Sequence, residues 1–404
     1  MAFSLRAGAL FLVGSVCLAG TLLLPAAESQ VPPGLPVASP ADVGMDAARL
    51  KAIDQAMQKF VDDRVVSGAV TLVARDGRIV HLGAVGLADL EASRRMQADS
   101  MFLIASMTKP VTASAIMMLQ DAGKLSVDDP VTKYLPEFAD AKLESGPPSR
   151  PITLKDVLTH TSGLGGEQRT EATLEETVRS IVKRPLAFQP GTKWQYSPGL
   201  NICGRIVEVV SKQPFDEFVA EHLFKPLGMR DTTFRPNEAQ RARLAKIYNV
   251  GPDGKLVPGA HWLADDWRDR AANPSGGLYS TAADMARFYQ MVLDGGTYNG
   301  KRILSREAVA QMTSVQTGEL KTGFTDGNGW GLGWCIIRKP QGITEMLSPG
   351  TYGHGGAFGT QGWVDPQRRM ILVLMIQRVG LPNSDGSDLR RSLQQLAVEA
   401  VQPR

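Results

Sequence analysis

The order of strand-type and helix-type sequence along the 404-residue chain is the feature that most constrains its fold. Two β-rich runs, Ala69 to Ala74 and Arg78 to Leu82, flank an Arg-Asp-Gly turn and predict a hairpin. Strand-type runs return near the C-terminus, at residues 334–338, 361–364 and 370–376. The last run is almost continuously apolar, which is typical of a central strand. The two ends of the chain are therefore predicted to build one antiparallel sheet.

Helical periodicity marks the segments that would cover this sheet. Residues 46–62 carry apolar side chains at intervals of three and four, and residues 389–400 repeat the pattern at the end of the chain. We expect these two helices to pack side by side on the sheet. Between the two strand regions the sequence consists of helical segments, including residues 202–210 and 284–293, and long loops.

These patterns predict an α/β (α+β) fold with an antiparallel sheet, flanking N- and C-terminal helices and a mainly helical inserted subdomain. We assign residues 41–105 and 320–404 to the sheet part and residues 106–319 to the helical part. The active cleft is expected where the insertion meets the sheet.

The N-terminus predicts export. Arg6 precedes an apolar segment from Ala7 to Leu24, and small and polar residues follow, as in a secretory signal peptide. We assign residues 1–29 to this peptide, with cleavage after Ala27 as the alternative. Residues 30–40 are proline-rich and are interpreted as a linker, so that the folded domain is 41–404. The mature protein is predicted to be periplasmic or secreted, without a stable membrane anchor.

Composition excludes several classes of partner. The formal charge is +3, from 44 basic and 41 acidic residues without long runs, so no nucleic-acid footprint is present. The five histidines show no metal-ligand spacing, and neither a metal nor another cofactor is expected. The mature chain keeps Cys203 and Cys335, which we interpret as buried small hydrophobes, and a bridge between them stays open. The oligomeric state is also open.

The run FLIASMTKP, residues 102–110, contains a candidate nucleophile at the buried start of a predicted helix. Ser106 and Lys109 lie three residues apart, so a helical turn would place an amine beside a hydroxyl. Such a lysine can activate the serine if burial lowers its pKa. Alone, the SxxK pattern favours a surface helix with a capping serine and a solvated lysine, because four-residue patterns recur by chance. A second SxxK at residues 180–183 and a KTG at residues 321–323 are interpreted as chance matches, and no GxSxG occurs.

Further motifs follow in a family order: ITLKDVLTHTSGL, PGTKWQYSPG, SGGLYSTAADMARF, GWGLGW and GHGGAFGTQGWVDP. Together with the SxxK segment they resemble the serine β-lactamase and penicillin-binding protein family, most closely class C β-lactamases and class VIII carboxylesterases. The resemblance implies that Ser106 is the acylated nucleophile, Lys109 a base or proton relay, and Tyr196 a proton shuttle. We expect oriented donor groups to lower the pKa of Tyr196 toward neutrality.

The resemblance also assigns the third element of the site. His354, Gly355 and Gly356 would bind substrate, because two glycines allow a close approach to a strand edge. The backbone N–H groups of Ser106 and Ala357 would form the oxyanion hole.

Three departures from the family pattern bear on the substrate. Pro198 stands where β-lactamases have an asparagine, and Asn201 could replace it only if turned inward. His354 and Gly355 replace a lysine and a threonine that help to hold the β-lactam carboxylate. No glutamate stands in a class A deacylation motif, so deacylation would rely on Tyr196 and Lys109.

We therefore predict a secreted serine hydrolase that acts on a small-molecule ester or amide through an acyl-enzyme, and most of all an esterase. The alternatives within this class are a weak class C-like β-lactamase, a D-aminoacyl peptidase and an acyltransferase. A non-catalytic binding or sensing module is the alternative of another class, and the intact Ser106, Lys109 and Tyr196 argue against it.

Overall fold

The computed structural model describes residues 1–2, 34–166, 169–264, 268–381 and 383–402. From Val31 to Arg404 the chain forms one compact unit. Apart from Met1 and Ala2, the predicted signal peptide lies outside the described residues, so its boundaries and those of the linker stay predictions. No helix in the described part of the chain is both long and apolar enough to cross a membrane.

An antiparallel sheet of eight strands joins the two ends of this unit. Its strands, in spatial order, are β10 (Asn328–Trp330), β11 (Cys335–Ile337), β12 (Tyr352–Gly355), β13 (Gln361–Asp365), β14 (Met370–Met375), β1 (Gly68–Arg75), β2 (Arg78–Asp89) and β3 (Arg94–Arg95). The junction is the pairing of β1 with β14, from Val70 opposite Met375 to Arg75 opposite Met370. All six residues of β14 are buried, and the predicted hairpin and central strand are confirmed.

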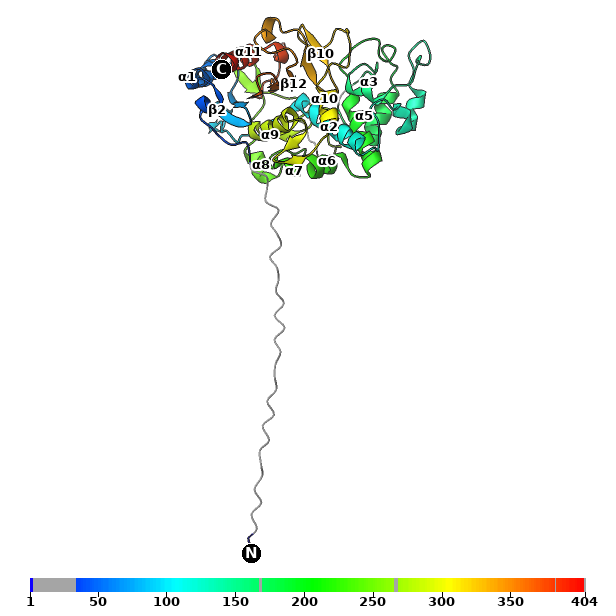
Figure 1. Cartoon of the computed structure of the whole chain (residues 1–404), viewed down its shortest axis with the longest axis horizontal. Helices are drawn as coiled ribbons and strands as arrows, with labels where there is room; N and C mark the ends of the chain where they lie inside the picture. Colours follow the sequence, from blue (N-terminus) through cyan, green and yellow to red (C-terminus); the bar gives the residue numbers. More distant parts are fainter. Residues whose placement is uncertain (3–33, 167–168, 265–267, 382, 403–404) are drawn as a thin grey trace. The chain divides into compact units, whose positions relative to one another are not determined.

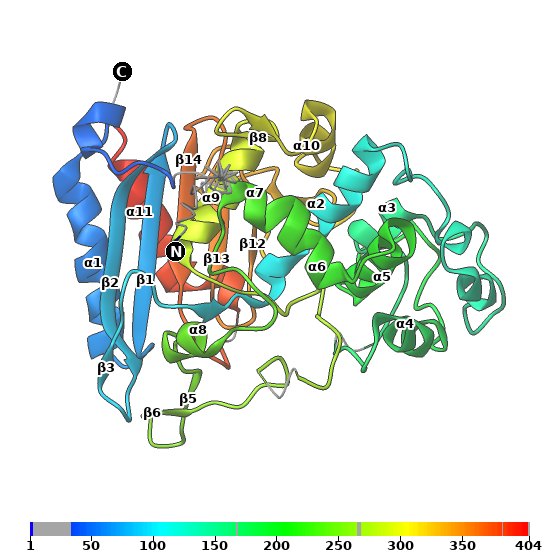
Figure 2. The ribbon, with the colours of Figure 1, turned by 90° about the horizontal axis from the view of Figure 1, so that it is seen from below.

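Two hydrophobic cores form because successive side chains of a strand point to opposite faces of the sheet. On β1, Ala69 and Val73 pack with α1 (Ala47–Asp62) and α11 (Asp388–Glu399). Figure 1 shows these two helices side by side, as their apolar faces predict. Val70 and Leu72 belong to the other core, with α9 (Ala282–Leu293) and the helical part. Figure 2 shows α1 and the helical part on opposite sides of the sheet.

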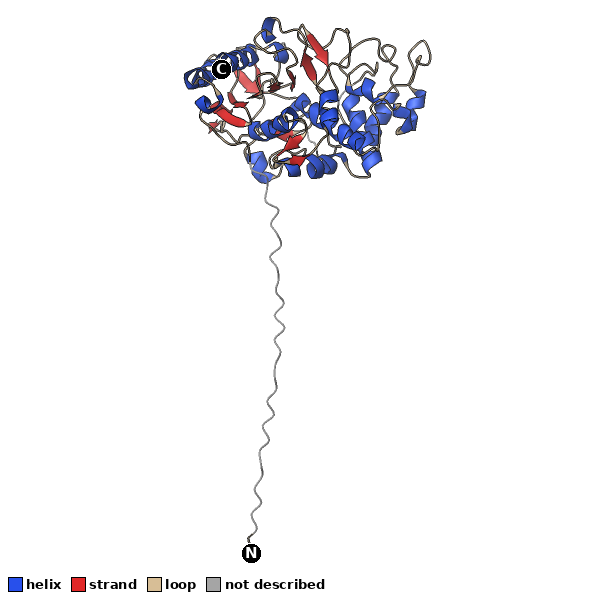
Figure 3. Ribbon diagram, in the orientation of Figure 1, coloured by secondary structure: helices blue, strands red, loops and turns tan. Residues whose placement is uncertain are grey.

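The inserted segment is mainly helical, and Figure 3 shows its helices gathered away from most of the strands. Its further helices are α2 (Thr108–Asp121), α3 (Leu154–Leu158), α4 (Leu174–Val182), α5 (Gly199–Ser211), α6 (Phe215–Val219), α7 (Lys225–Leu227), α8 (Glu238–Ala242) and α10 (Arg306–Met312). Three two-stranded ribbons lie among or just before these helices: β4 (Phe102–Leu103) with β7 (Tyr279–Ser280), β5 (Tyr248–Val250) with β6 (Leu256–Pro258), and β8 (Thr297–Tyr298) with β9 (Lys301–Arg302). Eleven of the fourteen α2 residues are buried, so α2 is the central helix.

The two cysteines of the unit, Cys203 on α5 and Cys335 on β11, are both buried and free. The bridge that the sequence left open is therefore not formed. Burial raises the pKa of both thiols, which keeps them protonated and unreactive at neutral pH.

Candidate active site

The predicted nucleophile follows a segment that is fixed on both sides. Ile104 donates its N–H to the Leu278 carbonyl at 2.9 Å and accepts a hydrogen bond from the Thr360 hydroxyl at 3.2 Å. The next residue, Ala105, has a φ of +47°, a left-handed conformation that costs a non-glycine residue about 1 kcal/mol. It begins the short 3-10 helix Ala105–Met107, which leaves Ser106 partly exposed ahead of α2.

Lys109 lies one turn further, fully buried, and its Nζ is 3.1 Å from the Ser106 Oγ. The same Nζ donates a hydrogen bond to the Ser275 carbonyl at 2.7 Å. Burial lowers the pKa of Lys109 well below its ordinary value, because desolvation disfavours the ammonium form. The lowered pKa favours the uncharged amine, and in that form Lys109 can accept the hydroxyl proton, as the SxxK spacing predicted.

Tyr196 completes a three-residue group. The Lys109 Nζ lies 4.5 Å from the centroid of the Tyr196 ring, and the Ser106 side chain hydrogen-bonds to Tyr196. Burial nevertheless raises the pKa of Tyr196 above its ordinary value of about 10, so the expected lowering toward neutrality is wrong. The physical reason is that Trp194, Phe324 and other rings desolvate the phenol, which disfavours its charged form. Tyr196 is a phenol at neutral pH.

The end of β12 approaches the nucleophile segment closely. A Cβ placed on Gly356 would lie 2.5 Å from the Ile104 carbonyl oxygen and 2.1 Å from the Thr360 Oγ1, so only glycine allows this contact. Ala357 follows and is exposed. The approach brings the predicted oxyanion donors, on Ser106 and Ala357, to the same cavity.

His354 on β12 is an uncharged member of the site. Its side chain is almost fully buried, and burial, with a smaller effect of Lys109, lowers its pKa to about 3. Its Nδ1 lies 2.6 Å from the Gly355 carbonyl oxygen. Because a carbonyl oxygen can only accept a hydrogen bond, this nitrogen carries the ring proton and donates it. The Nε2 has no hydrogen-bond partner among the described residues. A neutral imidazole supplies no fixed charge to a substrate carboxylate.

A cavity of about 430 Å³ brings the predicted residues together. Its lining residues come from both parts of the chain: Ser106, Tyr196, Phe324, His354, Gly355, Gly356, Ala357, Leu381, Asn383, Ser384 and Asp385. A neighbouring cavity of about 790 Å³ shares Phe324 and Asn383 with it and is lined in part by the KTG at residues 321–323. The KTG is thus outside the first cavity, and Ser180 and Lys183 of the second SxxK are exposed on and just after α4.

The amide that Pro198 lacks is not supplied to the cavity by Asn201. Asn201 does point inward, one turn along α5, and is fully buried. Its Oδ1 accepts a hydrogen bond from the Ser275 N–H at 3.1 Å, and it is not among the residues that line the cavity. Ser275 therefore contacts Asn201 through its N–H and Lys109 through its carbonyl, a positioning role that sequence reasoning missed.

A second missed residue is His160, which packs behind Tyr196. The two ring centroids are 4.6 Å apart, and the Ser197 N–H donates to the His160 Nδ1 at 3.2 Å. Burial lowers the pKa of His160 well below its ordinary value, so this ring is neutral too. The segment HTSGL was part of the resemblance, but nothing in the sequence connected it with Tyr196, 36 positions away.

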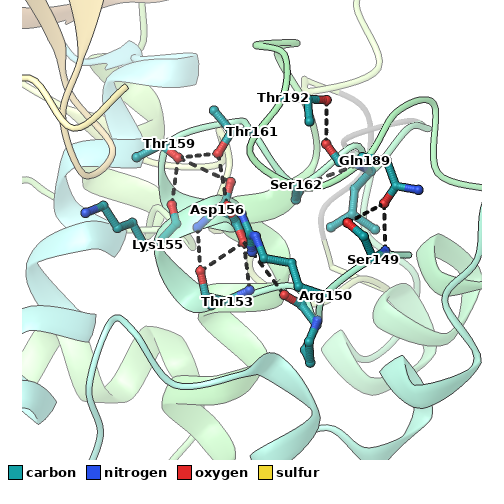
Figure 4. Close-up of polar contacts among 12 residues, drawn as sticks. Ser149, Arg150, Thr153, Lys155, Asp156, Thr159, Thr161, Ser162, Gln189 and Thr192 are labelled. Atoms are coloured by element: carbon teal, nitrogen blue, oxygen red, sulfur yellow. Dashed lines mark hydrogen bonds and ion pairs between the residues drawn. The ribbon is translucent and has the colours of Figure 1, made fainter. Parts of the chain in front are cut away.

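A polar network around Asp156 fixes the turn that carries His160 (Figure 4). Asp156 accepts two hydrogen bonds from Arg150, at 2.6 and 2.8 Å, and one from the Thr153 N–H in a capping box at the start of α3. The Thr161 hydroxyl donates to Asp156 at 3.3 Å, and the Gln195 N–H donates to the His160 carbonyl at 2.9 Å. The turn and the Tyr196 segment are thereby fixed to each other.

Replacing Asp156 by alanine is expected to lower the free energy of unfolding by about 2 kcal/mol, because the cap and the buried hydrogen bonds are lost together. Urea denaturation would measure the change. Asp128 is an exposed aspartate nearby in the sequence, and its replacement by alanine should change the free energy by less than about 0.5 kcal/mol. Equal effects of the two replacements would contradict the structural role of Asp156.

Among the described residues, no three His, Cys, Asp or Glu side chains cluster as metal ligands. A serine beside a phenol and a buried lysine of lowered pKa, in a cavity between an antiparallel sheet and a helical insertion, is the arrangement of a serine hydrolase.

The chain belongs to the Beta-lactamase family, whose sequence model matches residues 53–397. It is 33% identical to esterase EstB of Burkholderia gladioli, with 84% of this chain and 92% of EstB covered. It is 36% identical to penicillin-binding protein 4 of Amycolatopsis lactamdurans, over 73% and 76% of the two chains. A solved octameric penicillin-binding protein homologue from Pyrococcus abyssi superimposes with a TM-score of 0.71 at 26% identity, covering 89% of this chain and 80% of that one. The resemblance, the fold class and the enzyme class that the motifs predicted are confirmed.

Proposed function

We propose that this protein is a periplasmic or secreted esterase that cleaves small-molecule esters through an acyl-enzyme on Ser106. The observation that carries the proposal is the contact of the Ser106 side chain with both the buried Lys109 amine, whose pKa is lowered, and the Tyr196 phenol, at the wall of one cavity. Export rests on the signal-type N-terminal sequence alone.

In acylation, the Lys109 amine takes the proton of the Ser106 hydroxyl as its oxygen attacks the carbonyl carbon of the ester. The backbone N–H groups of Ser106 and Ala357 stabilise the oxyanion of the tetrahedral intermediate. The Tyr196 phenol gives its proton to the leaving oxygen as the bond to the acyl carbon breaks. The Lys109 ammonium then returns a proton to Tyr196, so an alcohol leaves and both groups regain their starting state.

In deacylation, a water molecule takes the place of the alcohol. The neutral Lys109 accepts a proton from this water, directly or through Tyr196, as the water oxygen attacks the acyl carbon. The acyl–oxygen bond to Ser106 breaks, the Ser106 oxygen receives the proton, and a carboxylic acid is released. An alcohol in place of water would give acyl transfer by the same steps.

The charge of the site favours esters over β-lactams. His354 is neutral and Pro198 offers no amide, so two contacts that hold a β-lactam are missing. The relative EstB is an esterase by name, whereas the relative from Amycolatopsis lactamdurans is a penicillin-binding protein. Side-by-side assays of p-nitrophenyl butyrate and nitrocefin test the proposal. We expect kcat/KM to be higher for the ester, and efficient turnover of nitrocefin alone would contradict it.

Replacing Tyr196 by phenylalanine is expected to leave the fold intact and to lower kcat for p-nitrophenyl butyrate by about 10²- to 10³-fold, the usual contribution of a positioned proton donor. The matched control is Tyr289→Phe. The Tyr289 hydroxyl is buried on α9 without a hydrogen-bond partner in the described part of the chain, so its removal should leave kcat unchanged. Wild-type kcat in Tyr196→Phe would remove Tyr196 from the mechanism.

A further inference from the structure

A carboxylate lies in the wall of the active-site cavity where the motifs assigned no residue. Asp385 belongs to the short 3-10 helix Ser384–Gly386 and lines the cavity with Ser106 and Tyr196. A Cβ placed on Gly355 would lie only 1.8 Å from the Asp385 Oδ1, so the carboxylate lies directly over the Gly355 Cα. The glycine of β12 thus makes room for an aspartate from a distant loop.

The Asp385 side chain is held in this place from two sides. The Gln361 Nε2 on β13 donates to the Asp385 Oδ1 at 3.1 Å and to the Ser384 carbonyl at 3.0 Å. The Asn383 side chain caps the 3-10 helix by accepting the Asp385 N–H at 3.1 Å. A fixed position matters, because a mobile carboxylate would rotate toward the solvent and lose its effect on a ligand.

Asp385 also dominates the charge of the cavity wall. The other described lining residues are apolar, glycine or uncharged polar residues at neutral pH, because His354 is neutral and Tyr196 is a phenol. Arg390 is a buried cation beside Asp385, and its Nη1 donates to the Asp385 backbone carbonyl at 2.7 Å. Its guanidinium stacks 3.9 Å from the Trp363 ring centroid and is 1% exposed, so it reduces the field of the carboxylate without facing a ligand.

The position of Asp385 relative to Tyr196 indicates which part of a substrate it meets. Tyr196 donates its proton to the leaving oxygen, so the leaving group must lie beside the phenol. The negative charge of Asp385 contributes to the rise in the pKa of Tyr196. The carboxylate and the phenol therefore lie close enough to interact electrostatically, and both line the same cavity. A leaving group that extends past the phenol and along β12, toward Gly355, would meet this carboxylate.

We propose that Asp385 is a specificity-determining residue that selects esters by the charge of their leaving group. It favours an alcohol or thiol that carries an ammonium group and disfavours one that carries a carboxylate. The inference rests on the proposed function, since it assigns the leaving-group side of the Ser106 reaction. A unit charge a few ångströms from a partly solvated carboxylate changes the binding free energy enough for an effect on the order of tenfold in kcat/KM.

Three S-butyryl thioesters with one acyl group test the proposal: those of thiocholine (cation), 3,3-dimethylbutanethiol (its neutral carbon isostere) and 3-mercaptopropionate (anion). Thiol release gives kcat/KM for each at low ionic strength. We expect the wild type to prefer the cation to the anion, and Asp385→Asn to lower the cation-to-anion ratio by at least about tenfold. Asparagine keeps the Oδ1 acceptor for Gln361. Asp385→Glu keeps the charge and should retain a preference for the cation.

The matched control is Asp388→Asn, which removes an exposed aspartate from the first turn of α11 and should keep the wild-type ratio. A wild type that prefers the anion, or an Asp385→Asn ratio within twofold of wild type, would overturn the inference. Hydrolysis of the neutral thioester that depends on Ser106 shows in either case that the proposed function stands. Failure of the wild type on all three thioesters and on p-nitrophenyl butyrate would count against the proposed function itself.

Discussion

Replacing Ser106 by alanine is expected to lower kcat/KM for p-nitrophenyl butyrate by about 10⁴-fold or more, because removing a nucleophile leaves only the binding and oxyanion contributions. The methyl group fits the same site, and Lys109 keeps its hydrogen bond to the Ser275 carbonyl, so the fold should be unchanged. Steady-state kinetics and a thermal melt would measure the two properties.

The chain offers a matched control for this variant. Ser180 also stands three residues before a lysine, but both side chains are exposed at α4. Ser180→Ala should therefore keep wild-type kcat/KM. Substantial ester hydrolysis by folded Ser106→Ala would show that another group attacks the substrate.

Replacing Lys109 by methionine is expected to lower kcat/KM by about 10³-fold, because methionine fills the buried space but cannot accept the Ser106 proton. The activity of the wild type should fall as the pH drops through the lowered pKa of Lys109, where the amine becomes an ammonium. His160 and His354 are already neutral at pH 7, so they do not change charge near pH 7 and do not contribute to this fall in activity. A pH–kcat/KM profile from pH 5 to 9 would show it.

Lys109 should also affect how the free energy of unfolding depends on pH, which is a property independent of activity. Its folded-state pKa is lowered, so between that pKa and the unfolded value of about 10.4 the unfolded state binds more protons. The Lys109 contribution to folding stability therefore rises with pH in this window, by up to about 1.4 kcal/mol per unit. Lys109→Met lacks this rise, and the difference in unfolding free energy between the two proteins should shift in favour of the wild type as pH increases. A difference that is independent of pH between 7 and 9 would mean that Lys109 is charged when buried.

The sheet and its flanking helices were predictable because they depend on local sequence patterns. The apolar run of β14, the hairpin turn of β1 and β2 and the stripes of α1 and α11 each have one favourable arrangement. Ser106 and Lys109 were predictable for the same reason, since one helical turn brings them together.

Features that depend on the environment of a side chain were not predictable. The pKa of Tyr196 was expected to fall because of nearby donors, whereas desolvation by packed rings, including Phe324 from a distant segment, decides its direction. Asp385 and Gly355 are 30 positions apart, and only the end of β12 and a loop after β14 bring them into contact. The position of His160 behind Tyr196 and the contacts of Ser275 depend likewise on tertiary packing.

The charges of the site bear on the choice between the proposed esterase and its alternatives. A β-lactam or a peptide substrate with a free carboxylate would meet a neutral His354 and the carboxylate of Asp385. A neutral or cationic ester would meet the same wall without repulsion. The Asp385 carboxylate therefore adds a physical reason for ester preference to the exchange of Pro198, His354 and Gly355.

The central claim is that Ser106 is the residue that becomes acylated, and a covalent probe tests it most directly. The folded protein would be treated with a fluorophosphonate, and intact mass and peptide mapping would locate the adduct. We predict one adduct per chain, on Ser106, with none on Ser180 and none on Ser106→Ala. An adduct on another residue, or no adduct on a folded wild-type protein, would contradict the account.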